Sequence, residues 1–135
     1  KESNRFSLAL AMIETREAMG IVDDILAVPG IDGIFIGPAD LSAAMGHVSQ
    51  FTHPTVMQTM ADAARRCQAL GKPVGTIGAT PEVVTQYRAM GYDYLAISSD
   101  MGLLMSGALA AVKALRGLSD EPHVHSLQTG TQTEA

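Results

Sequence analysis

Two carboxylates stand just after apolar stretches of this sequence. Glu14 follows the apolar run 6–13, and Asp40 follows "GIFIGPA" at 33–39. Neighbouring parallel strands lie about 4.8 Å apart, so carboxylates at adjacent strand ends can converge on one ion. Two carboxylates without a nearby His or Cys cluster suit a hard cation, Mg²⁺ or Mn²⁺ in preference to Zn²⁺, and leave coordination positions for water and a chelating substrate. The pair therefore indicates a divalent-cation site.

The same two residues also have a purely structural explanation. Glu14 can be a first-turn acid that the dipole of the following helix favours. Asp40 can be a turn residue that resembles an N-cap, before a helix that starts at Ser42. Spacing alone does not separate this explanation from the metal site.

Four strand–helix pairs position these residues. Apolar stretches typical of buried strands lie at 6–13, 32–37, 72–78 and 93–98, and helical patterns follow at 15–30, 53–71, 80–91 and 99–117. Thr80, Pro81 and Gly91 mark the start and end of the third helix, and 38–52 is expected to be a loop. Apolar strands separated by helices favour a parallel sheet and an α/β fold. In such folds the active site lies at the carboxyl ends of the strands.

Length and composition limit the function classes. The chain of 135 residues suits one domain, expected over 1–117, with 118–135 as a flexible or partner-contacting tail. A net charge of −5, without a basic cluster beyond Arg65 and Arg66, argues against nucleic acid. No apolar stretch reaches the length of a membrane span. The single cysteine, Cys67, is expected to be a small buried helical residue in a cytoplasmic protein.

Three stretches carry a resemblance to a known family: "MIETREAM" (12–19), "VPGIDGIFIGPADLSAAMGH" (28–47) and "GKPVGTIG" (71–78). Together they resemble the second half of the metal-dependent class II pyruvate aldolases, the HpcH/HpaI family. The resemblance implies a (β/α)₈ TIM barrel, of which this chain would supply units 5 to 8. It is consistent with a first strand that begins within a few residues of the chain start, as if the chain were cut in the middle.

The resemblance also implies roles for individual residues. Glu14 and Asp40 match the family's ligands for Mg²⁺ or Mn²⁺, with Co²⁺ as a further option. Pro38, Ala39, Asp40, Ile77 and Met12 would contact substrate, and the backbone N–H of Ala39 would meet the carboxylate of pyruvate. The family often has Gln where this chain has Met12, which cannot donate a hydrogen bond, so the substrate preference stays open.

The implied activity is that of a carbon–carbon lyase that makes or cleaves 4-hydroxy-2-oxo acids through the enolate of pyruvate, from pyruvate or oxaloacetate and an aldehyde. One alternative is an oxaloacetate decarboxylase or a macrophomate-synthase-like enzyme that uses the same metal enolate. Another is a catalytically silent half-barrel that serves assembly.

The resemblance further implies which parts lie elsewhere. The family's general-base His and its Arg belong to the first half of the barrel, so no catalytic residue is expected in this segment. His47 and His53 are expected to be ordinary loop residues. The implied partners are the N-terminal half of the barrel and further copies of the chain, as a trimer of dimers.

Overall fold

The computed structural model describes residues 5–78 and 80–119. Its elements are, in chain order, β1 (Leu10–Ile13), α1 (Arg16–Gly20), α2 (Val22–Ala27), β2 (Gly33–Ile36), α3 (Pro38–Ala44), α4 (Pro54–Ala69), β3 (Val74–Ile77), α5 (Pro81–Met90), β4 (Tyr94–Ala96) and α6 (Asp100–Ser119). The chain divides into two units between Ser99 and Asp100. The predicted boundary after residue 117 stays a prediction, and the predicted tail lies almost entirely outside the described residues.

The four strands form one parallel sheet in the order β1-β2-β3-β4. Met12 pairs with Phe35, Phe35 with Gly75, and Gly75 with Tyr94, so the strands run side by side with their carboxyl ends at one edge. The predicted α/β class and parallel sheet are therefore confirmed.

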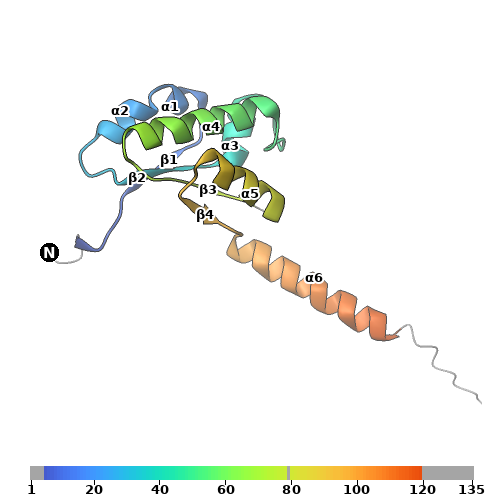
Figure 1. Ribbon diagram of the computed structural model, residues 1–135. Coiled ribbons are helices and arrows are strands. Elements are labelled where there is room, and N and C mark those ends of the chain that lie inside the picture. The colour runs from blue at the N-terminus through green and yellow to red at the C-terminus, as the bar shows by residue number, and fades with distance from the viewer. Residues whose placement is uncertain (1–4, 79, 120–135) are drawn as a thin grey trace, which may run out of the picture. The chain divides into compact units, whose positions relative to one another are not determined.

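The core lies between the sheet and the helices of the first unit. Figure 1 shows α1, α2 and α4 stacked over one face of the sheet. Most strand residues of this face are fully buried and meet buried side chains of the helices; the main ones are Ile13, Ile34, Ile36, Val74, Val56 and Met60. On the opposite face Leu10 is 43% exposed and Met12 is 57% exposed. The helices of the first unit thus cover the sheet on one side.

Three predicted elements have different bounds in the structure. The first strand starts at Leu10 instead of residue 6, and Phe6 and Leu8 are exposed. The helix predicted over 15–30 is two short helices that meet at Ile21, whose backbone (φ −112°, ψ 21°) leaves the helical region. The segment predicted as a loop, 38–52, contains α3, which begins at Pro38 because proline is preset for the first helical turn.

Acidic side chains fix the amino ends of the strands. The carboxylate of Asp32, just before β2, accepts a hydrogen bond from Ala9 N–H at 2.8 Å. Asp93, just before β4, accepts one from Val74 N–H at 2.9 Å in the same manner. Because this edge lies opposite the strand ends where sites form, we interpret both aspartates as stabilising residues.

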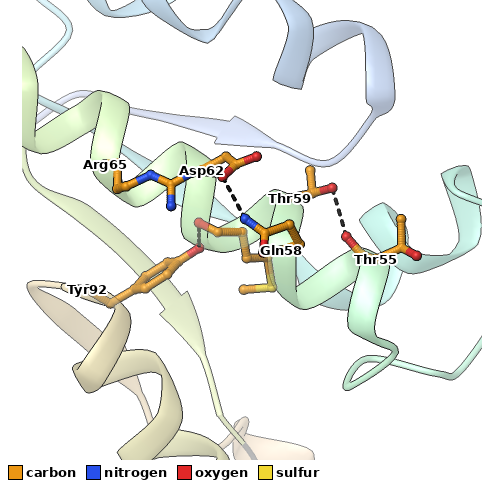
Figure 2. Close-up of polar contacts among 7 residues, drawn as sticks. Thr55, Gln58, Thr59, Asp62, Arg65 and Tyr92 are labelled. Carbon is orange, nitrogen blue, oxygen red and sulfur yellow. Dashed lines mark hydrogen bonds and ion pairs between the residues drawn. The ribbon is translucent and has the colours of Figure 1, made fainter.

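The connection into β4 is tied to the helix layer. The hydroxyl of Tyr92 donates to the carbonyl of Met60 in α4 at 3.2 Å, as Figure 2 shows. The Tyr92 ring also contacts that of Tyr87 in α5, with ring centroids 5.5 Å apart. These contacts hold α5 and α4 together behind β3.

Helix α6, taken by itself, is a helix of 20 residues that is rich in Leu, Ala and Met. Across the described ranges, no helix combines the length and apolar character that crossing a membrane requires.

Candidate functional site

Glu14 lies directly after β1 and before the cap of the next helix. Thr15 is the N-cap of α1, and its side chain accepts a hydrogen bond from Ala18 N–H at 3.1 Å. The acid in the first turn of α1 is Glu17. The structural explanation of Glu14 as a first-turn acid is therefore wrong, and the residue is half-buried.

Glycine at position 37 makes room for the Glu14 side chain. A Cβ atom at Gly37 would lie 2.6 Å from Oε1 of Glu14 and 2.9 Å from its Cγ. Gly37 has φ −87°, which any residue adopts, so space and not backbone freedom accounts for glycine here. The N–H of Gly37 donates to the carbonyl of Ile13 at 3.2 Å. The Glu14 side chain thus lies against the backbone at the carboxyl end of β2.

Asp40 lies in the first turn of α3. Gly37 is the N-cap and Pro38 follows it, so the helix begins well before Ser42, where the sequence suggested a start. Ser42 is buried inside the helix and donates to the carbonyl of Ala39 at 2.8 Å. Asp40 is therefore a first-turn acid that the helix dipole favours, and not an N-cap-like turn residue. Ala39 and Asp40 are both exposed to solvent.

A pocket of about 390 Å³ opens at the carboxyl ends of β2 and β3. Three of its lining residues, Pro38, Ala39 and Ile77, are among those expected to contact substrate. The other lining residues are Phe51, Thr52, Thr80, Val83 and Tyr87. Val83 and Tyr87 are four residues apart on α5 and so share one face of it, a signal in the sequence that could have found them. Phe51 and Thr52 belong to the segment expected to be a loop, where no pattern pointed to them.

Met12 lies away from this pocket. It sits on the open face of the sheet, opposite Phe35, and does not line the pocket. The cross-strand row of paired residues that starts with Met12 and Phe35 continues through Gly75 to Tyr94.

His47 and His53 lie in the segment between α3 and α4, as the sequence predicted. Their rings stack with centroids 3.6 Å apart and an angle of 16° between the planes. Nδ1 of His53 accepts from Thr55 N–H at 3.3 Å, so His53 caps α4. The pair therefore has a structural role at the start of α4. Within the described part of the chain, no three His, Cys, Asp or Glu side chains come together as a metal site.

Burial raises the pKa of two side chains in the helix layer, Tyr87 of α5 and Cys67 of α4. Burial raises the pKa of Tyr87 above its ordinary value. Burial also raises the pKa of the Cys67 thiol to about 11. Cys67 lies in α4 and is fully buried, which confirms the expectation for this residue. Both groups are therefore neutral at physiological pH.

Comparison with known proteins shows the family. The model of the HpcH/HpaI aldolase/citrate lyase family matches residues 2–107, and the chain belongs to this family. A solved HpcH/HpaI aldolase/citrate lyase family protein from Burkholderia cenocepacia J2315 is 31% identical and superposes with a TM-score of 0.74, over 81% of this chain and 42% of that one.

Two curated relatives carry the names of aldolases. A 2-dehydro-3,6-dideoxy-6-sulfogluconate aldolase of Pseudomonas putida is 40% identical over 117 residues, which is 87% of this chain and 46% of the relative. A pyruvate aldolase of Rhizobium etli (strain ATCC 51251 / DSM 11541 / JCM 21823 / NBRC 15573 / CFN 42) is 43% identical over 104 residues, 76% of this chain and 41% of the relative. The chain thus spans less than half the length of these relatives.

Proposed function

We propose that this chain carries the metal-binding part of a divalent-metal-dependent pyruvate aldolase, a carbon–carbon lyase for 4-hydroxy-2-oxo acids. The observation that carries the proposal is the Glu14 side chain packed against Gly37, three residues before Asp40 at the start of α3. Two carboxylates from neighbouring strand ends thereby belong to the same edge of the sheet. The relatives named as aldolases support the assignment of the reaction class.

The residues at this edge fit a hard divalent cation. Both side chains are carboxylates, and the space that a Cβ of Gly37 would fill is left to Glu14. Since no third His, Cys, Asp or Glu of the described residues joins them, water and substrate oxygens would complete the coordination. This arrangement suits Mg²⁺ or Mn²⁺, and Co²⁺ can replace them. When bound, the ion would polarise the keto oxygen of pyruvate and favour loss of a methyl proton.

The chain's own residues would orient the substrate. The N–H of Ala39 lies in the first turn of α3, where backbone N–H groups have no partner within the helix. In the proposal it donates to the carboxylate of pyruvate. Pro38 and Ile77 supply apolar walls beside it, and Met12 would face the substrate from the open side of the sheet.

We further propose that the remainder of a (β/α)₈ barrel covers the open sheet face. The exposed side chains of Leu10 and Met12 and the two free sheet edges need a partner, because soluble proteins cover such surfaces. An N-terminal half of the barrel would meet this need and would bring the proton-transfer groups. Assembly as a trimer of dimers and a cytoplasmic location belong to the same proposal.

The proposal is tested by Mn²⁺ binding to the chain in the presence of pyruvate, followed by electron paramagnetic resonance. We expect one site, which Glu14→Gln removes and which Glu17→Gln, a change in the same segment, leaves intact. Equal binding by wild type and Glu14→Gln would reject the metal site.

A second assay addresses turnover. Oxaloacetate decarboxylation with Mn²⁺, and with EDTA as control, is measured for the chain alone and with an N-terminal half of a relative. Metal-dependent turnover in the mixture supports the aldolase. Metal binding without turnover in either sample would favour a catalytically silent half-barrel.

A further inference from the structure

Tyr87 combines deep burial with an unpaired hydroxyl. Its side chain is only 1% exposed, and its ring packs against that of Tyr92. The Tyr92 hydroxyl donates to Met60, whereas the Tyr87 hydroxyl has no hydrogen-bond partner among the described residues. No polar side-chain atom of the described residues is both fully buried and unpaired. The Tyr87 oxygen must therefore touch accessible space, and the space that Tyr87 lines is the pocket.

Apart from Thr52 and Thr80, the rest of the pocket wall is apolar. Pro38, Ala39, Phe51, Ile77 and Val83 present carbon to the cavity, and none of the described lining residues is charged. The hydroxyl of Thr80 is engaged at the cap of α5, where it accepts from Val83 N–H at 3.4 Å. A carboxylate inside this pocket would lose its hydrating water without gaining a cation, which is strongly unfavourable. A neutral chain loses little and gains the burial of its carbon atoms.

The volume agrees with a small organic ligand. Pockets for such ligands start at roughly 300 Å³ and combine an apolar lining with a few placed polar groups. This cavity of about 390 Å³ has that composition, with Tyr87 as the placed polar group. It also adjoins the residues expected to hold pyruvate, because Ala39 and Ile77 form part of its wall.

We propose that this pocket binds the distal tail of the acceptor aldehyde: an uncharged aliphatic chain that ends in one neutral polar atom, to which the Tyr87 hydroxyl donates a hydrogen bond. This proposal rests on the proposed aldolase function. It assigns a short hydroxyaldehyde in preference to a semialdehyde with a terminal carboxylate. Tyr87 is a specificity residue at a distance from the reacting atoms.

The test uses two unreactive probes that mimic the two kinds of tail, 1-pentanol and pentanoate. Binding to the 135-residue chain, without metal or pyruvate, is followed in ¹H–¹³C spectra of the methyl groups of Val83 and Ile77. We expect 1-pentanol to shift these signals and pentanoate to bind roughly tenfold more weakly or worse, since its charge must be desolvated. Equal binding of the two probes, or shifts that avoid Val83 and Ile77, would overturn the assignment.

Variants locate the polar contact. Tyr87→Phe keeps the ring and removes the hydroxyl, and we expect it to weaken 1-pentanol binding roughly twofold to tenfold. Tyr92→Phe is the matched control, because it removes a neighbouring tyrosine hydroxyl that is bonded to α4; its affinity should match wild type. Val83→Phe, which places a ring in the cavity, should abolish binding. An equal loss in both tyrosine variants, or full affinity in Val83→Phe, would refute the proposal.

The two proposals fail in different experiments. Loss of Mn²⁺ and pyruvate binding together with normal 1-pentanol selectivity would reject the aldolase and leave a pocket for neutral ligands. Normal Mn²⁺ and pyruvate binding with no probe in the pocket would reject the acceptor subsite alone.

Discussion

Replacement of Gly37 by alanine should displace the Glu14 carboxylate without straining the backbone. The added Cβ would lie 2.6 Å from Oε1 of Glu14, and ordinary contact begins at 3.4 Å, so the oxygen must move by about 0.8 Å. Metal–ligand distances tolerate about 0.2 Å. Removing the support of a metal ligand typically lowers affinity by about 10- to 100-fold. We therefore expect Gly37→Ala to weaken Mn²⁺ binding by about that factor.

The assay is titration of Mn²⁺ into the variant at fixed pyruvate, with urea unfolding measured in parallel. Alanine is also a poorer N-cap than glycine, so α3 should lose about 1 kcal/mol of stability. The unfolding data show whether the variant is folded under the titration conditions. Gly20→Ala is the matched control, because a Cβ there meets nothing within 4 Å; its Mn²⁺ affinity should equal that of wild type.

A folded Gly37→Ala variant with wild-type Mn²⁺ affinity would refute the reasoning. It would mean that Glu14 either binds no metal or reaches the ion from a position that Gly37 does not govern. If Gly37→Ala loses as much Mn²⁺ affinity as Glu14→Gln, displacement of the Glu14 carboxylate accounts for the whole loss.

Three further predictions concern the scaffold around the site. Gly75→Ala should destabilise the chain by about 1–3 kcal/mol in urea unfolding, because the Cβ would lie 1.9 Å from a ring carbon of Tyr94; a change below about 0.5 kcal/mol would contradict the packing. Cys67 should react with a thiol reagent only in denaturant. Burial raises the pKa of its thiol from 9.0 in the unfolded chain to about 11, so its contribution to stability is complete below pH 9.0 and declines as pH rises toward 11. Fast labelling of the folded chain would contradict this. The hydrogen bond from Arg66 lowers the pKa of Asp23. The pair therefore stabilises the fold at pH values above the pKa of Asp23 in the unfolded chain, and this stabilisation is lost as pH falls through its pKa in the folded chain. Asp23→Asn should flatten the acid limb of the stability–pH curve, and an unchanged limb would show that the pair contributes nothing.

Local patterns were sufficient for the four strands and for their alternation with helices. Strands and helices differ in the period of their apolar residues, and Thr80, Pro81 and Gly91 bound α5 as predicted because capping depends on neighbours in sequence. The start of α3 was missed, although Pro38 is a strong helix-start signal. The reason is that α3 has only seven residues, which is too short for a helical repeat of apolar residues to show in the sequence.

By itself, the sequence determined the alternation of strands and helices, the parallel sheet and the placement of Glu14 and Asp40 after strands, because these follow from local periodicity and from the geometry of crossover connections. The tertiary structure alone decided that the Glu14 side chain lies against Gly37, that the Tyr87 hydroxyl has no hydrogen-bond partner among the described residues, and that three separate segments line one pocket. Those features depend on strand register and on contacts between residues far apart in the chain, which no local pattern encodes.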